Sequence, residues 1–259
     1  MLVRQVLTGI AEAIDLDAND LYEIGVALTE ACNNVVLHAY RGDEGPFEVE
    51  LYVRPLAIEV LVRDHGVGIG PRALRAAGTG LSVIQTLSQS VAVSTGPEGG
   101  TDIWMTFDTP RTAALNLLSA GQLEMPMFKE LGPGSTVEIT LVPTLLSRTI
   151  LPRLLSVFAA RAHFTTDRLL DGHLMADELA AGVERSTACS HLSVGISAQP
   201  RELELRLAPL PAGRADRLFL EPSLGRLGTV LGKLSTHHQV TTLASGEHEM
   251  LALQLVQSP

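Results

Sequence analysis

The chain has 259 residues, enough for two domains of ordinary size, with 46% apolar and 19% charged residues. This balance is typical of a folded globular protein and excludes a disordered chain. The net charge is −10, and residues 1–110 carry most of it, because six arginines, no lysine and fifteen acidic residues give 6 − 15 = −9. We therefore expect no direct nucleic-acid binding and no P-loop lysine in this half, since both need positive charge at phosphates.

Neither the cysteines nor the apolar runs indicate an exported or membrane protein. Cys32 and Cys189 lie far apart and form no CxxC pair, so we expect reduced, buried thiols in a cytoplasmic protein. The most apolar region, residues 144–160, is interrupted by Arg148 and Pro152. The sequence therefore predicts no membrane-spanning segment. The apolar stretch of residues 1–10 is too short for a signal peptide, so none is expected.

Apolar residues recur every three or four positions in the first 40 residues, which predicts helices over Leu2–Ile14 and Leu21–Tyr40. Asn19 is the expected N-cap of the second helix. The apolar stripe of that helix comprises Leu21, Ile24, Leu28, Ala31, Val35 and Ala39. This face should pack on the remaining elements of the domain.

Alternating apolar and polar residues then predict two hairpins separated by a helix. The expected strands and helix are Phe47–Val53, Ala57–Arg63, the helix Leu81–Ser90, Val91–Ser94 and Thr101–Phe107. Trp104 is expected in the core. The order helix–helix–strand–strand–helix–strand–strand predicts an α/β (α+β) fold, a two-layer sandwich of helices on a mixed or antiparallel sheet.

The second half of the chain repeats features of the first half. We expect a first domain at 1–110, a connector at 111–134 with a short helix at 113–119, and a second domain at 135–259. A shift of 147 places Asp20 and Gly25 on Asp167 and Gly172, and a shift of 145 places Pro55 and Glu59 on Pro200 and Glu204. The alternative is that two unrelated sandwiches share the same periodicity. His237 and His238 are expected in a turn between a helix and a strand.

A first set of polar residues lies on the second helix, where Glu30, Asn34 and His38 are four apart and share a face. The amide oxygen of Asn34 could ligate a hard cation such as Mg²⁺, and Glu30 could deprotonate a hydroxyl. The alternative is a solvated polar stripe.

Three glycine-containing turns lie at the end of a predicted strand, at the start of the third helix and at the start of the last strand. Asp64 follows a buried strand and could accept the amine of adenine, while Gly66 and Gly68 allow close approach of a flat base. Gly78-Thr79-Gly80-Leu81 opens a helix whose free amides could receive phosphates. Gly99-Gly100-Thr101 enters the last strand. Each of these alone is also compatible with an ordinary turn.

The ordered set over residues 1–108 resembles the conserved boxes of the GHKL ATP-binding superfamily, and within it the anti-sigma-factor serine kinases of the RsbW type. The resemblance implies a Bergerat-type ATP-binding fold with ATP and Mg²⁺ as cofactors. It further implies that Glu30 is catalytic, Asn34 is the Mg²⁺ ligand and Asp64 contacts adenine. The other nucleotide-binding residues implied are Gly66, Gly68, Arg75, Gly78, Thr79, Gly80, Leu81 and Thr101.

Two departures from this family pattern bear on function. Only nine residues, 69–77, separate Gly68 from Gly78, so the segment that covers the triphosphate in the family is short here. In the second half, the positions of Glu30, Asn34 and Asp64 are taken by Asp177, Ala181 and Pro209. We therefore expect a degenerate second copy without a nucleotide site, serving as a structural or partner-binding module.

The resemblance implies a kinase that phosphorylates a protein antagonist of the STAS type, sequesters a sigma factor, or does both. The alternative is a non-catalytic nucleotide-sensing switch that binds proteins, which the short covering segment favours. An ATPase or histidine-kinase fragment is a third reading, which we do not expect because the sequence shows no upstream helix with a phosphoacceptor histidine. We expect a monomer in which the two halves form an intramolecular pseudo-dimer.

Overall fold

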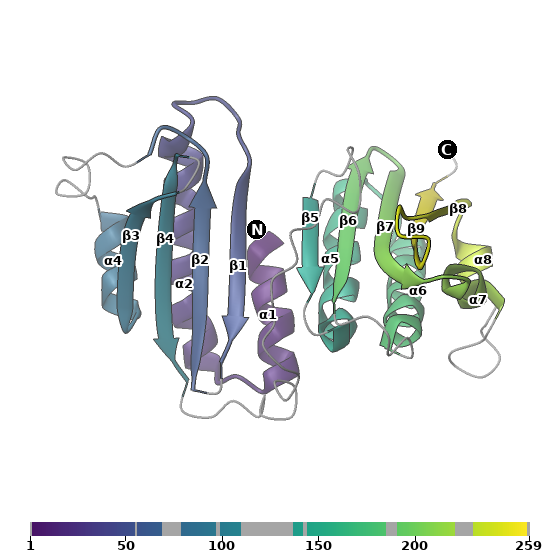
Figure 1. Ribbon diagram of the computed structural model, residues 1–259, viewed down its shortest axis with the longest axis horizontal. Coiled ribbons are helices and arrows are strands. Elements are labelled where there is room, and N and C mark those ends of the chain that lie inside the picture. Colours follow the sequence, from purple (N-terminus) through teal and green to yellow (C-terminus); the bar gives the residue numbers. More distant parts are fainter. Residues whose placement is uncertain are drawn as a thin grey trace. The chain divides into compact units, whose positions relative to one another are not determined.

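The computed structural model describes residues 2–54, 56–68, 79–96, 99–109, 137–141, 144–184, 191–220 and 230–257. The chain divides into two compact units, residues 3–121 and 122–259, and each unit has its own antiparallel sheet (Figure 1). The predicted connector at 111–134, with its short helix at 113–119, lies outside the described residues.

The first unit has the predicted order of helices and strands. Its elements are α1 (Leu2–Ile14), α2 (Ala18–Asn34), the π-helix η1 (Val35–Ala39), β1 (Phe47–Val53), β2 (Ala57–Asp64), α4 (Thr79–Leu87), β3 (Ser90–Thr95) and β4 (Thr101–Asp108). The sheet order is β1-β2-β4-β3, and every pair of neighbours is antiparallel. The prediction of helices packed on one sheet is confirmed, and the sheet is antiparallel rather than mixed (Figure 1).

Helix α2 supplies the centre of the first core. Ile24, Ala27, Leu28 and Ala31 have no exposed surface, because they share the face that packs against the sheet and α4. The N-cap is Asp17, whose carboxylate accepts from the backbone N–H of Asn19 at 2.8 Å. The expectation that Asn19 caps this helix is wrong, because the helix already begins at Ala18 and an earlier carboxylate satisfies its free amides.

The sheet of the first unit has one buried face and one open face. On β2, Ile58, Val60 and Val62 are fully buried on the face that receives the helices. Trp104 points the other way, is 36% exposed and stacks on Tyr52 with ring centroids 6.0 Å apart. The expectation that Trp104 is a core residue is wrong, because the alternation along β4 assigns the core face to its neighbours.

The second unit contains β5 (Val137–Leu141), the 3₁₀ helix η3 (Thr144–Leu146), α5 (Ser147–Arg161), α6 (Thr166–Glu184), β6 (Leu192–Gln199), β7 (Glu202–Pro211), α7 (Arg214–Leu220), α8 (Val230–Leu234), β8 (His237–Thr242) and β9 (His248–Val256). Its sheet order is β5-β6-β7-β9-β8. Strands β6-β7-β9-β8 therefore follow the same neighbour order as β1-β2-β4-β3 in the first unit, with β5 added at the edge beside β6.

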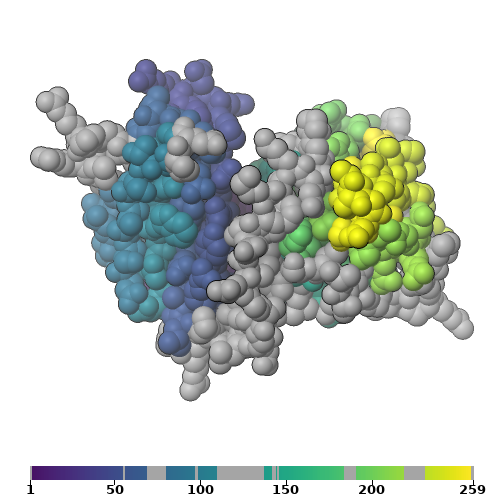
Figure 2. Space-filling model, viewed as in Figure 1, coloured from purple at the N-terminus to yellow at the C-terminus, as the bar shows by residue number. Residues whose placement is uncertain are grey.

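Strand β8 lies at the surface of the second unit, within the yellow region of Figure 2. It begins at His237, so His237 and His238 belong to a strand and pair with Gln254 and Leu253 of β9. The expectation of a turn at these two residues is wrong. A short connection follows α8, and the next residue, His237, already pairs with β9.

The core of the second unit is built mainly from leucine and other aliphatic side chains on β6, β7, β9, α5 and α6. Leu203, Leu205 and Leu207 on β7 have no exposed surface. Glu249 on β9 is also buried, and its carboxylate accepts from the backbone N–H groups of Gly213 and Ala215 at the start of α7. Among the described helices, none has the length and apolar character needed to cross a membrane.

Candidate functional site

Glu30 and Asn34 lie on the last turn and a half of α2 and are half-buried. Their neighbours Ala31 and Cys32 are buried in the core, so the helix holds the two polar side chains at the border between core and solvent. His38, the third residue of the predicted stripe, lies on the π-helix η1 and is exposed. The structure therefore keeps Glu30 and Asn34 together and leaves His38 at the surface.

Gly80, in the first turn of α4, lies directly beside both side chains. A Cβ atom built on Gly80 would lie 3.1 Å from Glu30 Oε2 and 3.4 Å from Asn34 Oδ1. The start of α4 is therefore in contact with the polar end of α2, and the free amides of a helix N-terminus face the region beside Glu30 and Asn34. Leu81 follows and is half-buried, while Ile84 anchors α4 in the core.

Asp64 ends β2 and is only 4% exposed. Its Oδ1 atom accepts from the backbone N–H of Gly66 at 2.8 Å, which closes a tight turn. Gly66 packs against the end of η1 so closely that a Cβ atom there would lie 2.1 Å from Ala39 O. Only glycine fits at this position, because the obstruction is backbone that cannot rotate away.

The turn before β4 lies against the turn after Asp64. Gly68 and Gly100 have φ angles of +73° and +75°, a region that side chains rarely adopt. A Cβ atom on Gly100 would lie 1.9 Å from Asp64 O, and one on Gly68 would lie 3.1 Å from Gly100 O. Thr101 follows and is buried at 4% exposure. The turns after β2 and before β4 are thus in backbone contact around Asp64.

An ion pair on the open face of the sheet joins β2 and β4 next to these two turns. Arg63 donates from Nε and one terminal nitrogen to the two carboxylate oxygens of Asp102, both at 2.9 Å. The hydrogen bonds to Asp102 raise the pKa of Arg63, and the negative charges of Asp102, Glu50 and Glu48 raise it further. Burial of the guanidinium lowers this pKa but is outweighed. Because Arg63 and Asp102 are direct cross-strand partners, the pair holds β2 and β4 in register next to Asp64 and Thr101.

Comparison with known proteins identifies the family of this unit. Residues 1–107 match the family described as "Histidine kinase-like ATPase domain". Serine-protein kinase RsbW of Bacillus licheniformis is 31% identical over 109 residues, which cover 36% of this chain and 68% of that protein. The chain belongs to the histidine kinase-like ATPase family. RsbW proteins of Bacillus thuringiensis (strain Al Hakam) and Bacillus anthracis are 27% and 26% identical over 108 residues, with the same shares of both chains covered.

The prediction of a GHKL-type domain related to the RsbW serine kinases is confirmed for the first half of the chain. Membership of this ATPase family implies that the chain binds ATP. A second, degenerate copy of the domain stays a prediction.

Part of the predicted nucleotide site lies outside the described residues. Arg75 and Gly78, with the rest of 69–78, are not described, and of Thr79 only its place at the start of α4 is. The residues that the structure brings together are Glu30, Asn34 and Gly80 on one side, and Asp64, Gly66, Gly68 and Thr101 on the other. Ala39, predicted from the sequence only as part of the apolar stripe, also contributes here: its carbonyl oxygen lies against Gly66 and accepts from Val67 N at 3.0 Å.

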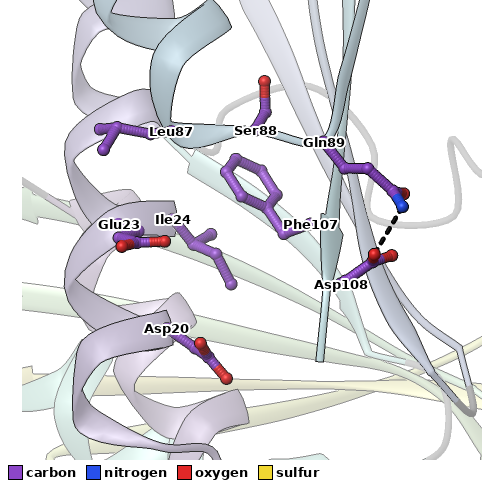
Figure 3. Close-up of a pocket in the computed structure, with 8 residues that line it drawn as sticks. All are labelled: Asp20, Glu23, Ile24, Leu87, Ser88, Gln89, Phe107 and Asp108. Atoms are coloured by element: carbon purple, nitrogen blue, oxygen red, sulfur yellow. Dashed lines mark hydrogen bonds between the residues drawn. The ribbon is translucent and has the colours of Figure 1, made fainter. Parts of the chain in front are cut away.

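A hollow of about 290 Å³ lies near the start of α2 and the end of α4, away from Glu30, Asn34 and Gly80. Figure 3 shows the residues that line it. Ile24 and Phe107 form its buried wall, and Asp20, Glu23 and Asp108 add carboxylates. Burial raises the pKa of Asp20, and the charges of Asp17 and Glu23 raise it further. None of the predicted site residues lines this hollow.

Proposed function

We propose that this chain is an ATP- and Mg²⁺-dependent serine/threonine protein kinase of the RsbW type. Its substrate would be a protein antagonist of the STAS type, and sequestration of a sigma factor would be its second activity. The observation that carries this proposal is the placement of Glu30 and Asn34 on successive turns of α2 beside the start of α4, where Gly80 has no side chain to crowd them. The relatives that resemble this chain are serine-protein kinases by name.

The donor atoms at this end of α2 suit magnesium. Asn34 offers an amide oxygen and Glu30 a carboxylate, and oxygen donors are what Mg²⁺ prefers. No group of three histidine, cysteine, aspartate or glutamate side chains that could enclose a metal occurs in the described part of the chain. A Mg²⁺ ion held by Asn34 would take its remaining ligands from water and from nucleotide phosphates. When bound, Mg²⁺ would neutralise charge on the phosphates.

The chemical step assigns a role to Glu30. A serine hydroxyl of the protein substrate transfers its proton to the Glu30 carboxylate while its oxygen bonds to the γ-phosphorus. The bond from that phosphorus to the β-phosphate oxygen breaks, and ADP leaves. Asn34 would hold the metal, and the backbone amides at the start of α4, with Gly78, Thr79 and Leu81, would contact the phosphates. Arg75 supplies positive charge in a half that contains no lysine.

The buried carboxylate of Asp64 supports adenine recognition on the other side of the site. A carboxylate accepts from the exocyclic amine of adenine, whereas guanine presents a carbonyl oxygen at the same position. Gly66, Gly68 and Thr101 surround Asp64, and the two glycines let backbone approach a flat base. The chain should therefore prefer ATP over GTP.

We further propose that the second unit is a degenerate copy of the first and has no nucleotide site. The first support is the strand order, β6-β7-β9-β8 in the second unit and β1-β2-β4-β3 in the first. The second is the element order, because in each unit two helices precede the first hairpin and helix separates the two hairpins. In the second unit the buried side chain near the start of β9 is Glu249, which is bound to the amides of α7. This unit would serve partner binding, and the expected monomer stays a prediction for sedimentation to test.

The deciding experiment is incubation of the full chain with γ-labelled Mg-ATP and candidate antagonist proteins, with nucleotide binding measured in parallel. Transfer of label to a serine of the antagonist that is lost in Glu30→Gln supports the kinase. Binding of ATP without transfer to any candidate supports the second function, a nucleotide-sensing switch, which the short 69–77 segment favours. In either role, the buried free thiol of Cys32 suits a cytoplasmic protein.

A further inference from the structure

Tyr40 follows the π-helix η1 directly and is in contact with two loops far from it in sequence. Its hydroxyl donates to Pro46 O in the loop before β1 and accepts from the backbone N–H of His65 at 3.1 Å. Gly45 packs on its ring so closely that a Cβ atom there would lie 2.3 Å from a ring carbon. Tyr40 is therefore held on one side by Gly45 and joined on the other to the turn after Asp64.

The backbone amides of that turn each have one acceptor. His65 N donates to the Tyr40 hydroxyl, Gly66 N to Asp64 Oδ1, and Val67 N to Ala39 O. Two of these three acceptors belong to the end of η1 and the residue after it. Among the described residues, Asp64 Oδ2 has no hydrogen-bond partner, so the turn occupies one carboxylate oxygen and leaves the other to a ligand.

The π-helix explains why these acceptors lie where they do. It begins immediately after Asn34 and ends at Ala39, so five residues join the proposed metal ligand to the residues that hold the Asp64 turn. A π-helical turn takes one residue more than an α-helical turn, and one residue corresponds to a rotation of about 100° around an α-helix axis. A continued α-helix would therefore direct Ala39 O and Tyr40 away from the turn.

We propose that Tyr40 is a positioning residue that holds the Asp64–Gly68 turn against η1, and that its hydroxyl thereby sets the selectivity of the site for adenine over guanine nucleotides. This inference rests on the proposed nucleotide site. It assigns Tyr40 no contact with the nucleotide and makes its effect dependent on Asp64. If Tyr40 only filled space, removal of its hydroxyl would leave base selectivity unchanged.

The test compares Tyr40→Phe with the parent chain by calorimetric titration of Mg-ATP and Mg-GTP into the full protein. The variant keeps the ring on Gly45 and removes only the hydroxyl. We expect the affinity for ATP to fall about five- to tenfold, the range of one hydrogen bond to a backbone amide, and the affinity for GTP to stay within twofold. Tyr22→Phe is the matched control, because Tyr22 is 64% exposed and should affect neither nucleotide.

A double-mutant cycle with Asp64→Asn tests whether Tyr40 acts through Asp64. In the Asp64→Asn background, Tyr40→Phe should change ATP affinity by less than about twofold, because the contact it supports is already lost. Gly45→Ala provides a second variant, since its Cβ displaces the Tyr40 ring from the other side and should lower ATP selectivity in the same way. Thermal unfolding checks that each variant is folded.

The outcomes separate this inference from the proposed function. Equal losses of ATP and GTP affinity, or the same ATP loss in both Asp64 backgrounds, would overturn the role of Tyr40 and leave the nucleotide site in place. A parent chain that binds neither nucleotide would overturn the proposed site itself. A selective, Asp64-dependent loss supports both.

Discussion

Gly80 at the start of α4 and Glu30 on α2 are so close that a Cβ atom on Gly80 would lie 3.1 Å from Glu30 Oε2. The same Cβ atom would lie 3.4 Å from Asn34 Oδ1. The absence of a side chain at position 80 therefore leaves the two polar side chains of α2 in place beside the helix start. This contact brings the third helix of the unit to the functional end of the second.

Gly80→Ala should impair the site without impairing the fold. The added methyl group would lie 3.1 Å from Glu30 Oε2, so the Glu30 carboxylate has to shift, and Asn34 Oδ1 would be in contact with the methyl group at 3.4 Å. We expect ATP affinity to fall about tenfold, which corresponds to about 1.4 kcal/mol. Alanine in a helical turn restricts the unfolded chain, so the unfolding free energy should not fall and could rise by about 0.4–1 kcal/mol. Titration calorimetry and urea denaturation measure the two effects.

Gly172→Ala on α6 is the matched control for this substitution. Gly172 is helical, and apart from its chain neighbours and the nearby backbone of α6 nothing lies within 4 Å of its Cβ position. The control should gain the same helix stability and leave ATP affinity unchanged. Unchanged nucleotide binding in Gly80→Ala would contradict the proposed position of the phosphates.

Glu30→Gln should separate chemistry from binding. The amide keeps the shape of the side chain but cannot take a proton, so we expect ATP affinity within a few fold of the parent and no phosphotransfer. Asn34→Ala should lose both, because it removes the proposed metal ligand. Phosphotransfer at the parent rate in Glu30→Gln would show that Glu30 is not the general base.

One nucleotide should bind per chain. Only the first unit carries Glu30, Asn34 and Asp64, whereas the aligned positions in the second half are Asp177, Ala181 and Pro209. Calorimetric titration of Mg-ATP into the full chain should give a stoichiometry of one, and Asp64→Asn should weaken binding by more than about 1.4 kcal/mol, or tenfold. Two sites per chain, or equal affinity for GTP, would refute the assignment of Asp64.

Glu249→Gln should destabilise the second unit. The buried Glu249 carboxylate accepts from Gly213 N at 3.0 Å and from Ala215 N, and hydrogen bonds to a charged acceptor are stronger than neutral ones. We expect the unfolding free energy of this unit to fall by about 1.5–3 kcal/mol in urea denaturation, with ATP binding unchanged. Glu247→Gln is the control, because Glu247 is exposed. Equal stability of the two variants would show that the charge of Glu249 does not stabilise the second unit.

Cys32 should resist thiol reagents in the folded protein. Burial raises the pKa of Cys32 from 9.0 to about 12, so the reactive thiolate is scarce at pH 8. In a Cys189→Ser background, a thiol reagent should label Cys32 only after unfolding. Because the folded pKa is the higher one, the stability that the neutral thiol contributes is present below pH 9 and is lost as the pH rises toward 12. Rapid labelling of the folded chain would contradict this burial.

The periodic elements of the first unit were predictable from local pattern alone. Leu2–Ile14 and Phe47–Val53 have the bounds that the apolar periods indicate, because a single buried face imposes a regular spacing on a helix or strand. The ends of elements were less predictable. Asp17 caps α2 in place of Asn19, and α4 begins at Thr79 rather than Leu81, since caps depend on which donor reaches the free amides first.

The face that a strand residue occupies could not be predicted where both faces carry apolar side chains. Trp104 alternates correctly along β4, yet it lies on the open face against Tyr52 because its neighbours Ile103 and Met105 are directed to the helices. Strand β8 likewise begins earlier than predicted, because His237 and His238 pair with β9. The residues around His237 carry no local signal of this pairing. Cross-strand pairing is a long-range choice that the local residues leave open.

The sequence by itself determined which chemical groups form the proposed nucleotide site: Glu30 and Asn34 one helical turn apart, Asp64 after a buried strand, and glycines at the turns. Local spacing is sufficient for this, because a helix places residues four apart on one face. Only the tertiary structure decided that Gly80 lies beside Glu30, that Gly66 lies against Ala39, and that Tyr40 holds the turn after Asp64. These contacts join segments distant along the chain, and packing around a shared core, rather than any local preference, brings such segments together.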